Sequence, residues 1–386
     1  MITGATDLEF IGWQVAGVAL HVLLPRPARP VVAVALTAAF LAVASWTSLV
    51  VLLAFTGAML AAVRLQGRQR DIALLSVVAG IAVALVGFKA LAPAPGHVAM
   101  DSVLLPLGLS YYSFRCIHVL VEVYLGEIEP PRPADLVRYL FFLPTFVAGP
   151  IHRYQPFIAE TGERPDLATF ARAGERILHG YAQIVILGNW LVSTRLFPAL
   201  KAGLAVDTAA FQYLECLQRG LNLYFQFAGY SSIAVGLALL HGHQVMENFN
   251  RPLLATNIAE FWRRWHMSLS SWCRDYVFTG AYSLTRRIWI GTLSTMLVIG
   301  VWHGLTENFA IWGLYHGLGV VIYHQTAHWA WLRPRGGSWL EIPRRVLAWF
   351  MTFNYFMLGM VWAKEPSIAH SLDVVLILLK GVGIGA

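Results

Sequence analysis

Residues 30–63 read PVVAVALTAAFLAVASWTSLVVLLAFTGAMLAAV and contain no charged side chain. As one straight helix this stretch would extend about 50 Å, whereas the hydrocarbon core of a bilayer is about 30 Å thick. Its middle, Ser45-Trp46-Thr47-Ser48, is the natural break, and arginines flank both ends: Arg26, Arg29, Arg64, Arg68 and Arg70. Two short helices that return to the same membrane face explain this pattern. The arginines predict that this face is cytoplasmic.

Five further stretches lack charge and reach the roughly 18 residues needed to cross hydrocarbon. They are residues 177–194, 220–246, 288–306, 308–332 and 346–363. The whole chain is 57% hydrophobic and 13% charged, against about a quarter charged in a typical soluble domain. These numbers exclude a soluble fold. Continuous apolar runs also exclude a β-barrel, whose strands alternate in short segments.

We therefore predict an all-α integral membrane protein, with about ten to twelve transmembrane and interfacial helices in one polytopic domain over residues 1–386. The apolar stretch at residues 11–24 follows an acidic start and is read as a retained helix, not a cleaved signal. An interfacial connector is expected around Pro150, Pro156 and Pro165. Beyond residue 63, helices are predicted at residues 72–91, 104–125, 137–148, 177–197, 211–240, 288–302, 309–331, 346–362 and 371–384.

The charge distribution and the cysteine and histidine spacings bear on which ligands the protein can bind. The formal charge is +7, but the arginines lie in short clusters between apolar spans, which favours topology signals over a nucleic-acid surface. Cys116, Cys216 and Cys273 are far apart and are expected to be buried thiols. The pair His324 and His328 has the spacing of a zincin helix, but Gln325 cannot replace its glutamate base, so we predict no metal site.

His303 is the first candidate for chemistry. It ends the charge-free run that begins at residue 288, with Trp302 before it and Gly304 after it. An ionisable residue at membrane depth is a functional candidate, and an imidazole can accept a proton at neutral pH. Gly304 would let another group approach the backbone closely. The residues alone leave two alternatives open, a functional group and a satisfied core histidine.

Residues 261–278, FWRRWHMSLSSWCRDYVF, carry the second candidate, His266. The spacing of the apolar side chains predicts one face of a single helix, formed by Trp262, Trp265, Leu269, Trp272 and Tyr276. The tryptophans and arginines suit an interface or a protein-lined cavity. The alternative is an amphipathic surface helix with one tolerated histidine.

Two further polar positions lie within predicted spans. Arg115, His118 and Glu122 share one helix face, which either lines a cavity or forms a buried ion pair between helices. His316 lies in the middle of a span, and we expect a structural hydrogen bond there.

Four stretches together resemble the membrane-bound O-acyltransferase family, and they cover residues 105–317 in the family's order. They are LPLGLSYYSFR from Leu105, FFLPTFVAGPIHRY from Phe141, LYFQFAGYSSIAVGL from Leu223 continued by ENFNRPLLATNIAEFWRRWHMSLSSWCRDYVF, and GVWHGLTENFAIWGLYHG from Gly300. Within the family, the chain is most similar to the membrane subunit that D-alanylates teichoic acids, and next to the alginate O-acetylase type. Gln226 departs from the family's usual aspartate.

The resemblance implies a helix bundle that encloses a tunnel, with His303 as the catalytic histidine and His266 as the second polar position of the active site. It implies no tightly bound cofactor. The donor would be a phosphopantetheine thioester on an acyl carrier protein, or acetyl-CoA, reaching a bacterial-type cytoplasmic membrane from the cytoplasm. The acceptor would be a teichoic-acid-like polymer or glycan outside, with an extracytoplasmic acyl-relay or acceptor-handling protein as partner. The candidates for lining the tunnel or supporting the two histidines are Arg115, Arg264, Trp265, Asp275, Trp302, Gly304 and His316.

Two alternatives stay open at this point. A transporter or channel for a lipid-linked substrate could also use intramembrane Arg115, Glu122 and Glu307. A non-catalytic scaffold would not need His303. Likewise, the arginines at residues 64–70 and 132–176 either attract an acidic carrier protein or only set the topology.

Overall fold

The computed structural model describes residues 8–91, 106–160, 162–328, 341–381 and 383. Every regular element in these ranges is helical, as the fold class predicted. Contacts cluster into two compact units: Met1–Tyr181 with Gly229–Met246, and Ala182–Ala228 with Glu247–Ala386. The single domain over residues 1–386 stays a prediction.

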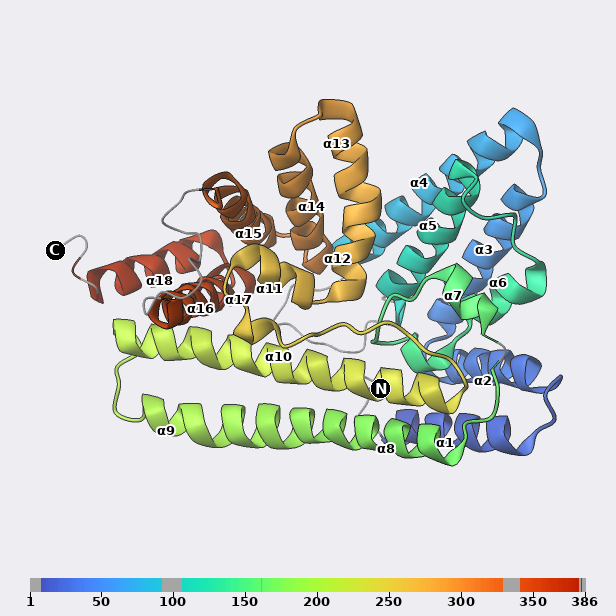
Figure 1. The fold of residues 1–386 in the computed structure, drawn as a ribbon, viewed down its shortest axis with the longest axis horizontal. Helices are drawn as coiled ribbons and strands as arrows, with labels where there is room; N and C mark the ends of the chain where they lie inside the picture. The colour runs from blue at the N-terminus through green and yellow to red at the C-terminus, as the bar shows by residue number, and fades with distance from the viewer. Residues whose placement is uncertain (1–7, 92–105, 161, 329–340, 382, 384–386) are drawn as a thin grey trace. The chain divides into compact units, whose positions relative to one another are not determined.

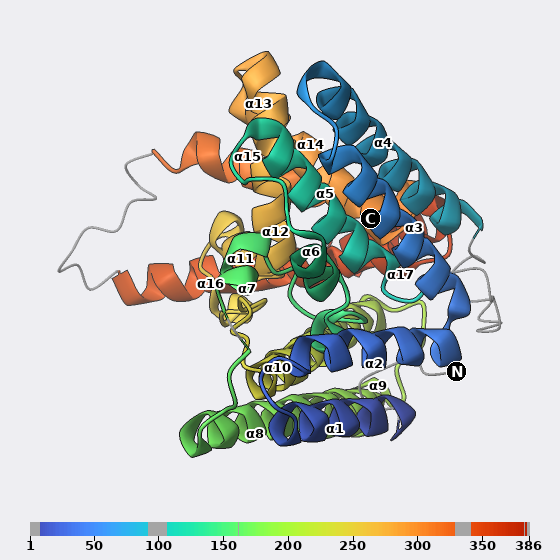
Figure 2. The ribbon, with the colours of Figure 1, turned by 90° about the vertical axis from the view of Figure 1, so that its right-hand side faces the viewer.

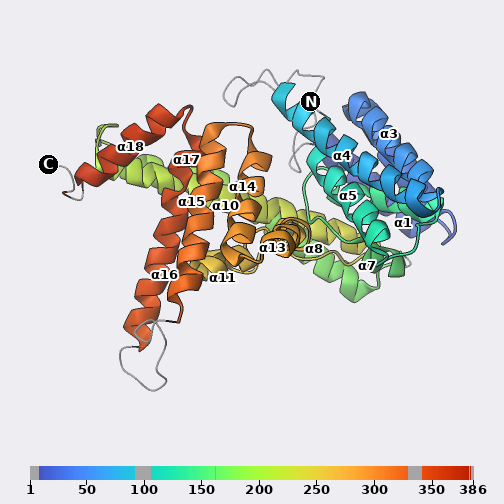
Figure 3. The same cartoon turned by 90° about the horizontal axis from the view of Figure 1, so that it is seen from above.

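The first unit contains α1 to α8. Their bounds are α1 Leu8–Leu23, α2 Arg29–Ala44, α3 Trp46–Val63, α4 Gly67–Leu91, α5 Leu109–Leu125, α6 Pro133–Leu140, the 3₁₀ turn η1 Leu143–Thr145, α7 Tyr154–Ala159 and α8 Leu167–Tyr181. Helices α1 and α2 pack side by side (Figure 2), and α3, α4 and α5 form a second group (Figure 3).

The predicted break in residues 30–63 is confirmed. Helix α2 ends at Ala44, and Ser45 caps α3 by accepting a hydrogen bond from the Ser48 amide at 3.4 Å. A serine side chain at this position satisfies one of the amide groups that the first turn of a helix leaves unpaired. The helical run is therefore interrupted at a single residue, Ser45, and the return to the same membrane face stays a prediction.

The predicted span at residues 137–148 is wrong. Helix α6 has 8 residues and is about 12 Å long, too short to cross a bilayer. Phe141 ends it and Pro144 lies in the following 3₁₀ turn, because proline cannot supply the amide that an α-helix needs. The predicted span at residues 104–125 begins later, at Leu109, after Gly108 in the left-handed conformation (φ 71°); residues 104 and 105 lie outside the described ranges.

The second unit holds the π-helical stretch η2 Ala182–Leu196 and α9 Phe197–Lys201, and α10 Ala209–Leu240 begins in it. The later elements are η3 Pro252–Leu254, α11 Ile258–Arg264, α12 Met267–Cys273, η4 Arg274–Phe278, α13 Thr279–Thr285, α14 Ile288–His303, α15 Glu307–Thr326, α16 Glu341–Leu358, α17 Met360–Lys364 and α18 Ile368–Gly381. The described residues thus form 18 α-helices, more than the ten to twelve predicted, because several are short. Residues 329–331 and 384, at the ends of two predicted spans, lie outside the described ranges.

In the part of the chain that the structure describes, four helices are long and apolar enough to cross a membrane: Trp46–Val63, Gly67–Leu91, Ala209–Leu240 and the helical stretch Glu341–Ala363. Shorter apolar helices are Leu8–Leu23, Arg29–Ala44 and Ile288–His303. Length and hydropathy therefore agree with a membrane protein.

Helices α14 and α15 form the tightest hairpin of the second unit (Figure 1). A Cβ atom added at Gly313 would overlap the backbone carbonyl of Met296, and one added at Gly300 would overlap the carbonyl of Phe309. Gly313 and Gly317 have the Gly-x-x-x-Gly spacing that lets two membrane helices approach closely. Their missing side chains fix the distance between α14 and α15.

Residues 261–278 do not form one helix, so that prediction is wrong. The helix stops at Arg264 and restarts at Met267, and between them His266 has a left-handed backbone with φ 45°. Asn248 compensates for the break: its carbonyl accepts from the Met267 amide at 2.9 Å, and its Oδ1 accepts from the Ser268 hydroxyl at 2.6 Å. These bonds come from a residue 20 positions away, which a local pattern does not contain.

Candidate active site

His303 is the last residue of α14, and its side chain is exposed. Three aromatic rings surround it, with ring centroids at 4.6 Å for Trp302, 5.3 Å for Trp312 and 6.1 Å for Phe309. Gly304 allows the last of these contacts, because a Cβ there would lie 2.6 Å from Cε2 of Phe309. The expectation that Gly304 permits a close approach is confirmed, and the approaching group is the Phe309 ring.

His266 lies in the break between α11 and α12 and is only 2% exposed. Its ring contacts Phe227 at 4.6 Å and Trp302 at 6.0 Å between centroids. Neither ring nitrogen has a hydrogen-bond partner among the described residues. A buried polar group without a partner is costly and calls for an explanation, such as a ligand.

Burial also sets the charge of His266. It lowers the pKa of this imidazole from 6.5 to about 3, and the nearby His303 lowers it further in the same direction. The ring is therefore neutral at physiological pH, with one nitrogen that can donate and one that can accept.

Trp302 joins the two histidines, since its indole contacts the rings of both His303 and His266. The exposed imidazole of His303 and the buried, neutral imidazole of His266 therefore contact the same tryptophan ring. Chemically, the first can take a proton and the second can donate a hydrogen bond to a developing negative charge.

His316 is fully buried in α15 and does not make the structural hydrogen bond that we expected, since both ring nitrogens lack a partner in the described structure. The ring lies against Trp262 at 5.3 Å and Trp312 at 4.8 Å. A Cβ at Gly359 would come within 2.7 Å of its Nε2. That prediction was wrong because aromatic rings, not polar groups, surround the imidazole.

The remaining candidates of the second unit have local partners. Arg264 pairs with Glu260 on its own helix at 2.7 Å, and Asp275 pairs with the adjacent Arg274 at 3.0 Å. Trp265 is buried against Phe261, with stacked rings 5.4 Å apart. No contact described for these three residues reaches His303, so their assignment as tunnel groups stays a prediction.

Arg115 belongs to the first unit and is fully buried. Its guanidinium donates to the Thr145 hydroxyl at 2.6 Å and to the Thr145 carbonyl. Three residues later on α5, the His118 ring accepts a hydrogen bond from the Tyr154 amide at 3.0 Å. On the same helix face, Glu122 lies 3.9 Å from His118. These contacts tie α5 to η1 and α7. The bonds described for Arg115 go to Thr145 and not to a carboxylate, so the choice between a cavity lining and a buried ion pair stays a prediction.

Three residues that support the site were missed at the sequence level: Asn248, Gly313 and Gly317. The Gly-x-x-x-Gly spacing was the available signal for the glycines. Asn248 had none, because its role depends on a distant segment. The three cysteines are buried, as predicted. Among the described residues no group of three or more His, Cys, Asp or Glu side chains could hold a metal ion.

The sequence model of the membrane-bound O-acyltransferase (MBOAT) family matches residues 33–362. The chain belongs to this family. Both candidate histidines fall inside the matched MBOAT region.

Among curated MBOAT-like relatives, the chain is similar to "Probable alginate O-acetylase AlgI" of Azotobacter vinelandii, with 30% identity over 70% of this chain and 52% of that protein. It is also similar to "Teichoic acid D-alanyltransferase" of Bacillus subtilis, with 31% identity over 54% of this chain and 53% of that protein. A third relative, from Streptococcus thermophilus and also named "Teichoic acid D-alanyltransferase", is 34% identical over 46% of this chain and 44% of its own length. The chain thus spans about half the length of the curated relatives it matches.

Proposed function

We propose that the protein is a membrane-embedded acyltransferase that moves an acyl group from a thioester donor to a hydroxyl of a cell-envelope polymer. The observation that carries the proposal is that the indole of Trp302 contacts both its neighbour His303, at the end of α14, and His266, in the break between α11 and α12. Membership of the MBOAT family and relatives that are named for acyl transfer support the same reaction.

In the proposed reaction, His303 accepts the proton of the acceptor hydroxyl while the oxygen attacks the thioester carbonyl. The neutral His266 donates a hydrogen bond to the oxyanion of the tetrahedral intermediate. Collapse of that intermediate breaks the carbon–sulfur bond, and the thiolate takes the proton from His303. General-base catalysis of this kind contributes about 10²- to 10⁴-fold in rate, and an oxyanion donor about 10²- to 10³-fold.

The exposure of His303 and the burial of His266 suit these separate roles. A base that must meet a large acceptor needs access, whereas an oxyanion donor is more effective in a dry environment. The donor is D-alanyl or another acyl group on a carrier protein, or acetyl-CoA, approaching from the cytoplasm. The acceptor is a teichoic-acid-like polymer or glycan beyond a bacterial cytoplasmic membrane, delivered with the help of an extracytoplasmic partner.

The test is His303→Ala in the purified, reconstituted full chain, with transfer of a labelled acyl group to the acceptor as the readout. We expect the rate to fall by about 10²- to 10⁴-fold. His324→Ala is the matched control, since His324 is an exposed histidine on the adjacent helix α15 and should keep the wild-type rate.

Two results would contradict the proposal. A folded His303→Ala protein that transfers acyl groups at the wild-type rate would remove the base and favour a scaffold role. Movement of labelled substrate across the membrane without a new ester or amide on the acceptor would identify a transporter.

A further inference from the structure

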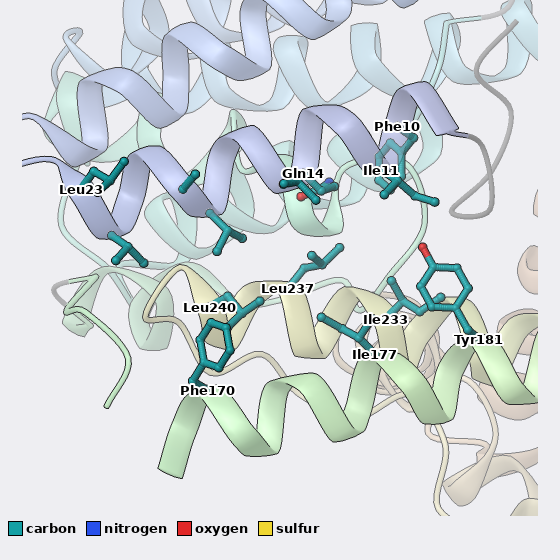
Figure 4. Close-up of a pocket in the computed structure, with 14 residues that line it drawn as sticks. Phe10, Ile11, Gln14, Leu23, Phe170, Ile177, Tyr181, Ile233, Leu237 and Leu240 are labelled. Atoms are coloured by element: carbon teal, nitrogen blue, oxygen red, sulfur yellow. The ribbon is translucent and has the colours of Figure 1, made fainter. Parts of the chain in front are cut away.

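A long apolar groove lies within the first unit, between α1, α8 and the C-terminal part of α10, with a volume of about 510 Å³. Figure 4 shows Leu23 and Phe170 at one end, Phe10 and Tyr181 at the other, and Gln14 between them. Apart from Gln14 and the Tyr181 hydroxyl, the lining is aliphatic or aromatic. Such a lining recognises a hydrocarbon rather than a polar metabolite.

The length of the groove fits one lipid chain. Residues from Phe10 to Leu23 line it along α1, which is about 20 Å at 1.5 Å per residue. One leaflet contributes half of a hydrocarbon core of about 30 Å, so an acyl chain needs about 15 Å. The groove can therefore hold a single chain over its whole length.

Positive charge gathers just beyond the Leu23 end. Arg29 and Arg164 both donate to the Leu24 carbonyl, at 3.2 and 3.1 Å. Arg26 lies 3.2 Å from Glu163, and both of these side chains are well exposed. Three guanidinium groups thus face one carboxylate, and this end of the groove favours an anion.

We propose that this groove binds one acyl chain of an anionic membrane phospholipid, with the lipid phosphate at Arg26 and Arg164. The groove is apolar along its length and has an excess of arginine at one end. A phospholipid matches this arrangement, because its hydrocarbon chain ends at a negatively charged headgroup. The site uses none of the residues assigned to acyl transfer and does not rest on that function.

Gln14, which lines the groove, allows a test of whether the bound ligand is a hydrocarbon chain. Its side chain is 3% exposed, and neither amide atom has a hydrogen-bond partner in the described structure. A hydrocarbon chain cannot supply one. Gln14→Leu should therefore strengthen lipid binding, because the unpaired amide would be replaced by an apolar side chain.

The experiment uses the full chain in nanodiscs with phosphatidylglycerol that carries a photoreactive diazirine on one acyl chain, followed by peptide mass spectrometry. We expect labelling of α1 and α8. Ala19→Trp should fill the groove, since Ala19 lines it, and abolish this labelling. Ala16→Trp is the matched control, because Ala16 is exposed on the same helix but does not line the groove.

The headgroup is tested by the double variant Arg26→Gln with Arg164→Gln. Its control is Arg64→Gln with Arg68→Gln, which removes the same charge at exposed positions, Arg64 just after α3 and Arg68 in the first turn of α4. The first pair should weaken labelling by about tenfold, and the second should leave it unchanged. Equal labelling by phosphatidylcholine would overturn the anionic headgroup. Equal loss with Ala16→Trp and Ala19→Trp, or weaker labelling of Gln14→Leu, would overturn the acyl-chain site.

Discussion

Helices α14 and α15 meet closely at Gly300 and Gly313, and we call this contact the glycine seam. Gly313→Ala tests whether the seam holds the active site in place. The added methyl would overlap the Met296 carbonyl and lie 3.1 Å from its carbonyl carbon and 3.2 Å from the Leu297 Cα. All three atoms are backbone and cannot rotate aside, so the helices must separate by about 1 Å. A displacement of this size at reacting groups costs on the order of 10² in rate, and α15 carries Trp312, which contacts His303.

Alanine substitutions at two other glycines are expected to cost less activity than Gly313→Ala, and they serve as comparisons. At Gly317, an added Cβ would meet Cδ2 of Leu293 at 2.9 Å, the end of a flexible side chain, so Gly317→Ala should cost much less than Gly313→Ala. At Gly280, in α13, an added Cβ would meet no atom within 4 Å. Gly280→Ala should keep the full rate, and its helix should gain about 0.5–1 kcal/mol from the alanine.

The assay is the turnover number for acyl transfer by each reconstituted variant, normalised to the fraction that melts cooperatively. This correction separates a misplaced site from a misfolded protein. If folded Gly313→Ala turned over at the wild-type rate, or if the three variants lost rate equally, the seam would not position His303.

Three further outcomes follow from individual side chains. His266→Asn should keep acyl transfer within about tenfold of wild type, because asparagine tolerates the left-handed backbone and retains a donor, whereas His266→Ala should lose about 10²- to 10³-fold; equal rates for the two variants would remove the oxyanion role. Because burial lowers the pKa of His266 from 6.5 to about 3, the unfolded state binds the proton first. The contribution of the buried, neutral His266 to the stability of the folded state is complete above pH 6.5 and declines as the pH falls toward 3. Melting temperatures from pH 7.5 to about pH 4 should thus fall more steeply for wild type than for His266→Asn, and parallel curves would contradict this. Arg115→Met should lower the free energy of unfolding by about 1–3 kcal/mol, because Thr145 loses both of its bonds to the guanidinium; an unchanged denaturation midpoint would show that these bonds contribute nothing.

Apolar runs and their breaks predicted the membrane helices well, because each depends on a local property of the sequence. The break at Ser45 is an example, since charge-free length and a local serine cap determine it. The span at residues 137–148 failed because hydropathy outweighed Pro144 in the prediction. Residues 261–278 failed for a different reason: their helical spacing is real, but hydrogen bonds from Asn248 stabilise a break that periodicity cannot reveal.

The same distinction applies to the candidate site. His303 could be found as an ionisable residue at the end of an apolar run, whereas its aromatic surroundings depend on how α14 meets α15. The isolation of His316 from polar groups depends in part on rings from α11 and α16, which are distant from it in the sequence.

The glycine seam between α14 and α15 also has a consequence for the order of folding. Only residues 304–306 separate the two helices, so little loop-closure entropy opposes their pairing. Contacts between sequence neighbours form early, ahead of those that must wait for distant segments. We therefore expect the hairpin that carries His303 and Trp312 to form early in folding, before the contacts of the second unit that join distant segments.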